Sequence, residues 1–234
     1  MINNDIDLEH YRRQLAAHKR VQVRDYLQAD AAARLESCLA NEVPWTLALR
    51  DGAGPRTIAH AEYAAFDAAT SARVLAATAD SGRGGGFRFA YDSYMMVTAY
   101  REQRDPGLLL HSVLEFFNSP EHIAFVRALT GDARIRRINA QATRYRAGHF
   151  LRHHSDEDVD EGRLYAYVMN LSRDWQADWG GLLQFIDDDG RVSDTYLPAW
   201  NTLSLFAVPA GHAVSMVAPW ADRDRLAITG WFLA

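Results

Sequence analysis

A chain of 234 residues with 48% hydrophobic content can bury a large core, so its fold needs neither a disulfide nor a structural metal. The net charge of −5 argues against nucleic acid as a partner, because surfaces that bind nucleic acid are usually basic. The first residues lack the apolar run of a signal peptide, and no segment reaches the roughly 20 apolar residues of a membrane span, so we expect a cytoplasmic protein without a membrane partner.

The first half of the chain has mostly helical spacing. Residues 8–20 are amphipathic with the period of a helix, and residues 21–27 alternate like a short strand. Asp30 is expected to cap the alanine-rich helix that follows it. That helix contains the single cysteine, Cys38, which has no partner for an internal disulfide and no basic neighbour, so we expect an inert buried thiol. Residues 61–78 predict a further helix.

A run of glycines, Gly84–Gly86, precedes a group of aromatic residues. Phe87, Phe89, Tyr91 and Tyr94 follow it within a few positions. Two interpretations remain open. The segment is either a flexible loop that enters a strand with one aromatic face, or a mobile lid that closes over an active site.

The pattern changes after about residue 133. Before it, residues 106–119 and 119–131 predict two more helices, the second with Ser119 as its cap and a proline at its first position. After it, helical spacing gives way to short apolar runs. We therefore divide the chain into a helix-rich part, residues 1–133, and a β-rich core, residues 134–234, which we expect to form one structural unit.

Short strands separated by turn signals fill the second part. The hairpin signal Asp187–Gly190 separates two of them. Many short strands at this spacing indicate an all-β sandwich or barrel rather than a parallel α/β sheet. The expected strands lie within residues 134–148, 162–172, 180–187, 202–210, 212–219 and 225–234.

Two histidines and one aspartate form a candidate metal site. On an extended backbone, His154 and Asp156 point to the same side, so both side chains can reach one ion. His212 begins a later strand and is the candidate third ligand. Two histidines and a carboxylate on one face suit a non-haem Fe(II) oxygenase, because they leave coordination positions open. His153 and Asp158 compete for the same roles, and a polar, solvated loop is the alternative to a metal site.

The order of motifs around these residues resembles the prolyl-4-hydroxylase-type 2-oxoglutarate/Fe(II) dioxygenases, and in particular the branch that modifies proteins of the translation apparatus. The similarity spans roughly residues 134–234. It implies a mainly β fold with helices, in which a double-stranded β-helix (jelly roll) is supported by helices of the N-terminal half. The matching motifs are Gly148-x-Phe150-Leu151-x-x-His154-x-Asp156, Arg163 at the start of a strand, Trp179-Gly180-Gly181-Leu182-Leu183, Trp200-Asn201-Thr202-Leu203, His212, and the closing segment that begins at Arg225.

The resemblance implies that His154, Asp156 and His212 bind Fe(II) and that 2-oxoglutarate and O2 are co-substrates, with release of succinate and CO2. It leaves room for ascorbate as an accessory reductant. Asp156 favours hydroxylation over halogenation, since halogenases of this type give up the carboxylate. The implied substrate is a prolyl residue of a protein or peptide.

A buried arginine is expected to hold the far carboxylate of 2-oxoglutarate, because a guanidinium binds a carboxylate in bidentate fashion. Arg225 directly precedes the closing strand where family members place theirs, and Arg223 is its rival in the same phase. Thr229 shares the face of Arg225. Tyr145 resembles a tyrosine near the co-substrate of related enzymes, and Asn170 stands where some relatives have a co-substrate-binding tyrosine.

Three alternative functions use the same residues. A hydroxylase of a free amino acid or another small molecule shares the site and differs only in substrate. An AlkB-like nucleic-acid demethylase shares the fold and the triad, but that subfamily has a second arginine six residues after the first, where this chain has Trp231. A non-catalytic β-helix protein that binds a metal or a partner is disfavoured, because both the triad and the arginine are intact.

Overall fold

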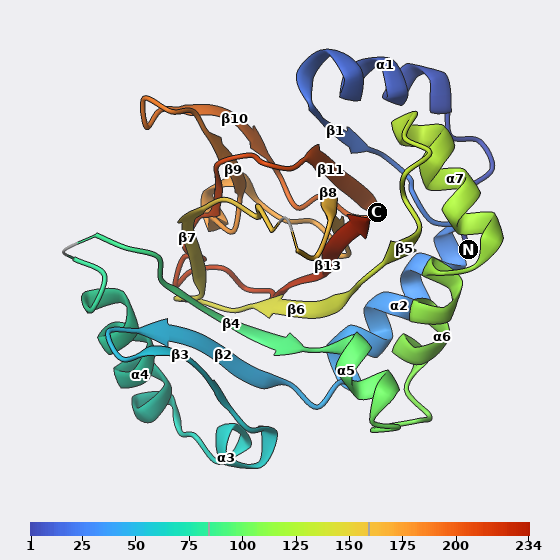
Figure 1. Cartoon of the computed structure of the whole chain (residues 1–234). Coiled ribbons are helices and arrows are strands. Elements are labelled where there is room, and N and C mark those ends of the chain that lie inside the picture. The colour runs from blue at the N-terminus through green and yellow to red at the C-terminus, as the bar shows by residue number, and fades with distance from the viewer. Residues whose placement is uncertain (84, 159) are drawn as a thin grey trace.

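The computed structural model describes residues 1–83, 85–158 and 160–234. Gly84, the first residue of the glycine run for which a lid was considered, lies outside the described residues. The strands curl into a mostly antiparallel sheet that nearly closes into a barrel, with helices packed outside it (Figure 1). This is the jelly-roll fold that the sequence predicted.

Neighbouring strands come from distant parts of the chain. The N-terminal strand β1 pairs with β11 at one end of the order, and β10 lies at the other end. The central order, with bounds, is β1 (Arg20–Val23), β11 (Thr202–Ala207), β8 (Arg163–Asn170), β13 (Arg225–Leu233), β6 (Gln141–Tyr145), β4 (Phe89–Tyr94), β7 (Phe150–His154), β12 (His212–Val214), β9 (Leu183–Ile186) and β10 (Val192–Tyr196).

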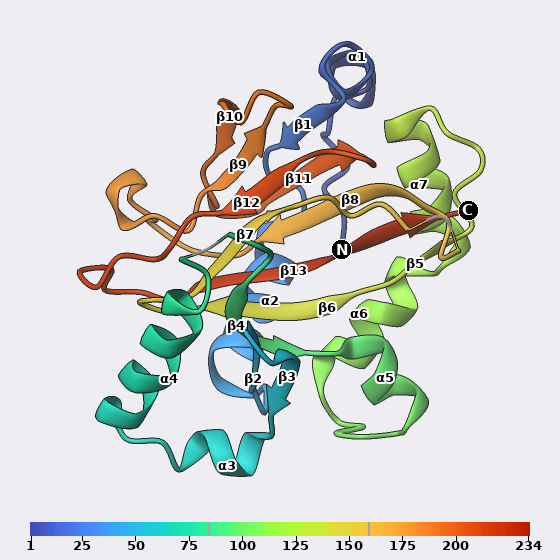
Figure 2. The ribbon, with the colours of Figure 1, turned by 60° about the vertical axis from the view of Figure 1, so that its left-hand side comes forward.

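Three further strands extend this order. Strands β2 (Thr46–Asp51) and β3 (Gly54–Ile58) form a hairpin, and β2 pairs with β4. The short β5 (Arg137–Ile138) pairs with the end of β13. Figure 2 shows the β2–β3 hairpin below the folded sheet, with β4 between it and the other strands.

Strand β4 is the place where the sheet folds over. Its first residues, Phe89 and Ala90, pair with β7, whereas Asp92, Ser93 and Tyr94 pair with β6. The strand therefore changes partners within a few residues. This change brings the half of the sheet that contains β7, β12, β9 and β10 over the half that contains β6, β13, β8 and β11 (Figures 1 and 2).

The helices cover the outside of this sheet. Most of them lie along one side in Figure 1, and α3 and α4 lie beyond the β2–β3 hairpin. The largest core cluster joins both parts of the chain, since it contains Leu35 and Val126 from helices and Leu205 and Ile228 from strands. The helices are α1 (Leu8–His18), α2 (Ala29–Asn41), α3 (His60–Ala64), α4 (Ala68–Asp80), α5 (Met96–Arg101), α6 (Leu109–Phe117) and α7 (Pro120–Thr130), with a 3-10 turn, η1, at Ala177–Trp179.

Local signals explain the ends of α7. The Ser119 hydroxyl accepts a hydrogen bond from the backbone N–H of His122 at 3.2 Å, and Pro120 occupies the first turn. Gly131 ends the helix in the left-handed conformation, and its N–H bonds to the carbonyl of Arg127. These caps satisfy backbone groups that the helix leaves free, and the cap predicted at Ser119 is confirmed.

Three predictions about the first part were wrong. Asp30 does not cap α2, because the helix already begins at Ala29 and Asp30 lies in its first turn. The single helix expected over residues 61–78 is two helices, since Asp67 leaves the helical conformation and caps α4 by accepting from Thr70 N–H at 2.7 Å. The β2–β3 hairpin was not expected in the mostly helical first half, whereas β1 overlaps the short strand expected at residues 21–27 and β4 follows the glycine run, where one interpretation placed a strand.

Cys38 is a free thiol buried in α2, and burial raises its pKa to about 11, as expected for an inert core residue. Among the described residues, no helix is long and apolar enough to cross a membrane.

Candidate active site

A cavity of about 330 Å³ lies between the two halves of the folded sheet. Its lining includes His154, Asp156 and His212 as well as Arg225. Strands β4, β6, β7, β8, β12 and β13 all contribute lining residues. The candidate metal ligands and the candidate co-substrate arginine, which lie far apart in the sequence, therefore face one enclosed space.

The three candidate ligands converge within this cavity. His154 and His212 are directly opposite each other in the β7–β12 pair, and Asp156 follows the end of β7. The Nε2 atoms of His154 and His212 lie 3.3 Å and 3.5 Å from the two carboxylate oxygens of Asp156. One ligand atom from each residue lies within 4.8 Å of the others, so a single ion can contact all three.

Backbone contacts orient both imidazoles for metal binding. The Nδ1 atoms of His154 and His212 each lie 2.9 Å from a carbonyl oxygen, that of Arg152 and that of Ala210. A proton on Nδ1 satisfies each carbonyl and leaves the Nε2 lone pair directed toward Asp156. This tautomer is the one a metal ligand requires.

The charges in the site also suit a divalent cation. Burial lowers the pKa of His212 to about 4, so its imidazole is neutral at physiological pH. Burial alone would raise the pKa of Asp156, but its two histidine neighbours outweigh burial, and the pKa lies below its ordinary value. Two imidazoles and one carboxylate on one face match the ligand set of non-haem Fe(II) centres with open positions.

The rival ligands lie elsewhere. His153 is exposed, because it alternates with His154 along β7. Asp158 lies 3.6 Å from the guanidinium of Arg163 and does not join the cluster of ligand atoms. His149 is buried, but its Nε2 is 3.9 Å from Asp92 rather than near the triad.

Among the described residues, Arg225 is a buried cation without a carboxylate partner. Its side chain is 2% exposed, no ion pair joins it to a carboxylate of the described residues, and its Nε atom has no hydrogen-bond acceptor there. The guanidinium lies over the ring of Tyr145, 4.9 Å from the centroid. Burial lowers the pKa of Arg225, which expresses the cost of an unpaired buried charge. A bound carboxylate would remove that cost.

Other predicted co-substrate residues fall into two groups. Tyr145 and Thr229 line the cavity beside Arg225. Asn170 is buried but does not line it, and its amide instead faces the hydroxyl groups of Thr202 and Ser204. The rival Arg223 is half exposed and pairs with Asp174 at 3.3 Å.

Sequence reasoning missed the contacts of Arg163. Its guanidinium donates to the backbone carbonyl of Asp156 at 3.2 Å and pairs with Glu161 at 2.7 Å. It also lies 3.7 Å from the ring centroid of Trp231, which lines the cavity and whose indole N–H has no acceptor among the described residues. Arg163 therefore holds the loop that carries Asp156, the candidate metal ligand. The sequence feature that could have predicted these contacts is the position of Arg163, seven residues after Asp156 and at the start of a strand.

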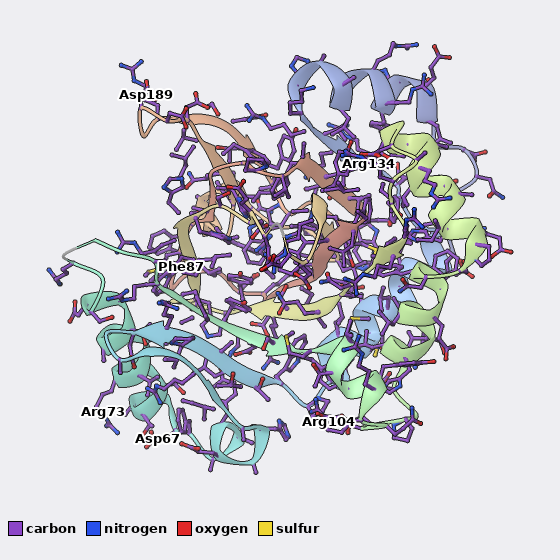
Figure 3. The ribbon with its side chains drawn as sticks, viewed as in Figure 1. Asp67, Arg73, Phe87, Arg104, Arg134 and Asp189 are labelled. Atoms are coloured by element: carbon purple, nitrogen blue, oxygen red, sulfur yellow. The ribbon has the colours of Figure 1, made fainter. Side chains whose placement is uncertain are left out.

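Strand β4 supplies an aromatic wall to the cavity. Phe87, Phe89 and Tyr91 line it, and the ring of Phe87 lies 4.9 Å from that of His154. In Figure 3, Phe87 lies between the ribbons of β4 and β7. Tyr94 was expected on the same face, but the odd-numbered residues face the cavity, and Tyr94 is buried on the other side, where its hydroxyl donates to Asp105.

The predicted Trp-Gly-Gly step passes close to the loop before β13. Gly180 has a left-handed φ of 69°, and a Cβ atom there would collide with the backbone carbonyl of Met216. The next residue, Gly181, packs against Arg225, because a Cβ atom at Gly181 would lie 3.2 Å from the Cδ atom of Arg225. The two glycines thus let this loop close the cavity behind the arginine.

Comparisons with known proteins agree with this geometry. Residues 140–233 match the family model described as the 2OG-Fe(II) oxygenase superfamily. Among curated proteins, prolyl 3-hydroxylase OGFOD1 of Mus musculus is 33% identical over 102 residues, which cover 41% of this chain and 18% of that protein. The same enzyme of Xenopus laevis is 34% identical over 83 residues, covering 32% and 16%. The matched region thus spans less than a fifth of these relatives.

Solved structures share the whole fold. A prolyl-4-hydroxylase of Pseudomonas putida has a TM-score of 0.59 at 20% identity, with 97% of this chain and 98% of that chain covered. A prolyl hydroxylase of Trichoplax adhaerens, in complex with a peptide of the hypoxia inducible factor oxygen degradation domain, has a TM-score of 0.60 at 16% identity, covering 97% and 88%. At these identities the likeness shows the jelly-roll fold.

Proposed function

We propose that the chain is a member of the 2OG-Fe(II) oxygenase superfamily, whose model matches residues 140–233, and that it is a dioxygenase that hydroxylates a prolyl residue of a protein or peptide. Members of this superfamily use Fe(II), 2-oxoglutarate and O2. The proposed reaction inserts one oxygen atom of O2 into a C–H bond of the substrate, and the other oxygen enters succinate as 2-oxoglutarate loses CO2.

One observation carries the proposal for the chemistry. A buried guanidinium without a carboxylate partner among the described residues, Arg225, faces the same cavity as the triad of His154, Asp156 and His212. A structural arginine at this depth would be paired, since an unpaired buried charge is costly. A dicarboxylate ligand explains both features, because one end can chelate the metal while the other pairs with the arginine.

Each residue then has a defined task. His154, Asp156 and His212 would hold Fe(II), which together with 2-oxoglutarate supplies the oxidising chemistry when bound. Arg225 would bind the far carboxylate, with Tyr145 packed against its guanidinium and Thr229 beside it. The role proposed for Asn170 has no contact with the cavity to support it.

The surrounding residues position the site and exclude water. Arg163 holds the backbone of Asp156 and so keeps the carboxylate in place. Apolar side chains such as Leu183 and Phe206 line the cavity next to the polar residues. A dry site strengthens the contact between Arg225 and a carboxylate and limits uncoupled reaction with water.

The substrate class rests on two further observations. Phe87, Phe89 and Tyr91 form an apolar wall beside the metal ligand His154, and a proline ring presents apolar faces that can pack on such a wall. The curated relatives are named prolyl 3-hydroxylases, although the matched region covers less than a fifth of their length. Both observations favour a prolyl residue over a nucleobase.

The test is a mass-spectrometric assay with Fe(II) and 2-oxoglutarate. Proline-containing peptides and extracts of cellular proteins are incubated with the wild type and with His154→Ala, and succinate is measured in parallel. We expect a gain of one oxygen atom on a prolyl residue, dependent on 2-oxoglutarate and absent in the variant. Robust hydroxylation of a free amino acid, with none on any protein or peptide, would replace this substrate class with the small-molecule alternative.

A further inference from the structure

A buried cluster of charged residues lies on the outer side of the strands that form the cavity. Its centre is Asp92 of β4, which is 0% exposed. The Asp92 carboxylate accepts a hydrogen bond from the hydroxyl of Tyr63 at 2.6 Å and from the Nε of Arg144 at 2.7 Å. Arg146 Nε lies 3.3 Å from the same carboxylate, and Asp224 lies 3.8 Å from Arg144. We call these residues, with His149, the Asp92 cluster.

The cluster touches every strand between the arginine and the metal. In the sheet, β13 carries Arg225 and β7 carries His154, and β6 and β4 lie between them. The cluster takes Arg144 from β6, Asp92 from β4, Asp224 from the residue before β13, and His149 from the residue before β7. Its ion pairs therefore link β13, β6 and β4, and His149, whose Nε2 lies 3.9 Å from Asp92, adds a contact from the residue before β7.

Its members alternate with residues of the cavity wall. Tyr91, Tyr145 and Arg225 each stand next in sequence to a cluster residue and point to the opposite face. Across the strands these three side chains form a stack, with the rings of Tyr91 and Tyr145 5.2 Å apart and nearly parallel and the guanidinium of Arg225 over Tyr145. A shift of the cluster on one face must move this stack on the other.

Asp92 also occupies the fold line of the sheet. Strand β4 pairs with β7 up to Ala90 and with β6 from Asp92 onward. The angle at this point sets how far the metal-binding half lies from the half with Arg225. Tyr63 of α3 fixes the carboxylate from outside, and Arg146 contacts the Tyr63 hydroxyl. Burial raises the pKa of Asp92 to about 7, while Arg144 lowers it, so the ion pair supports the ionised form.

We propose that Asp92 is a positioning residue that sets the distance between the metal triad and Arg225, and thereby the length of the dicarboxylate that the site accepts. This inference rests on the proposed function, since it assumes that 2-oxoglutarate spans the two ends. A ligand that must reach both ends is sensitive to their spacing, whereas the metal alone contacts only one end. Loosening the cluster should therefore affect 2-oxoglutarate more than metal.

The test compares two matched tyrosine variants. Tyr63→Phe removes the hydroxyl that bonds to Asp92, and Tyr94→Phe removes a hydroxyl that bonds to Asp105 at 3.0 Å, away from the fold line. Both tyrosines are buried. Binding of Mn(II), of 2-oxoglutarate and of 2-oxoadipate, which is one methylene longer, is measured by calorimetry. Two further variants are measured in the same way. Asp92→Asn removes the carboxylate charge itself, and Asp92→Asn/Arg144→Gln also removes the guanidinium charge that pairs with it.

We expect Tyr63→Phe to weaken 2-oxoglutarate binding about 3-fold and Asp92→Asn to weaken it about 10-fold. The ratio of the affinity for 2-oxoglutarate to the affinity for 2-oxoadipate should fall by similar factors, and the affinity for Mn(II) should not change. Tyr94→Phe should match the wild type, and the double variant should recover part of the preference. If Asp92→Asn does not fold, Tyr63→Phe decides.

Two results would overturn the inference: Tyr63→Phe with wild-type affinity and selectivity, or an equal loss of Mn(II) and 2-oxoglutarate binding. Failure of the wild type to bind 2-oxoglutarate would instead refute the proposed function.

Discussion

The two faces of strands β4, β6 and β13 differ in how their most deeply buried charged residue is paired. On the outer face, Asp92 and Arg144 pair with each other at 2.7 Å, and Tyr63 satisfies the second carboxylate oxygen. On the cavity face, Arg225 has no carboxylate partner and the indole N–H of Trp231 has no acceptor among the described residues. Asp92 and Arg225 are both almost fully buried, at 0% and 2% exposure, so solvent does not explain the difference between these two groups.

The difference identifies which face binds ligands. A buried polar group that is already paired stabilises the fold, whereas one without a partner costs free energy until a ligand arrives. The chain tolerates that cost at Arg225 because its core is large. A buried charge is therefore a better indicator of function when its partner is missing than when it is merely buried.

Removing a metal ligand gives the largest expected effect on the cavity face. His154→Ala, Asp156→Ala and His212→Ala should each reduce turnover to background and weaken Fe(II) binding, because one ligand atom of three is lost. The fold should persist, since the core does not depend on metal, and circular dichroism checks this. Full activity in any one variant would remove that residue from the triad.

Changing the arginine should separate the two candidates in the last strand. Arg225→Lys keeps the charge but loses the bidentate contact, which is worth about 1.5–3 kcal/mol, or about 10–150-fold in the concentration of 2-oxoglutarate required. Arg223→Lys is the control, because Arg223 is half exposed and pairs with Asp174. A larger defect in Arg223→Lys than in Arg225→Lys would indicate that Arg223, two residues earlier, binds the co-substrate.

Stability measurements test the comparison itself. Arg144→Met removes the guanidinium that pairs with the buried carboxylate of Asp92, so it should lower the free energy of unfolding by about 3–5 kcal/mol. Arg225→Met removes a buried charge that has no partner, so it should raise the free energy of unfolding of the ligand-free protein by about 1–3 kcal/mol while abolishing 2-oxoglutarate binding. Urea unfolding gives both values. Equal destabilisation by the two substitutions would contradict the view that Arg144 stabilises the fold whereas Arg225 destabilises the ligand-free protein.

A paired group far from the cavity should have a smaller, pH-dependent effect. His122 is buried, its Nε2 lies 2.9 Å from the Tyr26 hydroxyl, and burial lowers its pKa to about 4. The unfolded histidine, with a pKa of about 6.5, binds a proton first as the pH falls, so the free energy of unfolding should decrease between about pH 6.5 and 4, by about 3 kcal/mol from this residue. His122→Gln should flatten the urea-unfolding profile over that range; an unchanged slope would contradict the assignment.

The second part of the chain was predictable because its signals are local. The triad residues His154 and Asp156 are two positions apart, and the strands around them show regular alternation with turn signals between them. The turn at Asp187–Gly190 joins β9 and β10 as predicted, with Gly190 N–H bonded to the carbonyl of Asp187. The jelly-roll fold followed from this pattern together with the family resemblance.

The first part was harder because its role is set by long-range pairing. The β2–β3 hairpin was missed although Asp51-Gly52 between the two strands is a turn signal. No local pattern reveals that β4 changes partners at Asp92, or that Asp92 meets Arg144 over fifty positions later in the chain. Arg225 was identified by its motif, but its lack of a partner appears only when the side chains around it are placed.

The most direct test of the proposed function is the binding of 2-oxoglutarate measured by calorimetry, with and without Mn(II), in the wild type and in Arg225→Met. In the proposed site, one cavity binds the metal through His154, Asp156 and His212 and the far carboxylate through Arg225. We therefore expect one 2-oxoglutarate bound per chain, with an affinity that falls sharply when the metal is omitted and also when the arginine is replaced. An affinity that stays the same after both changes would contradict the proposed site.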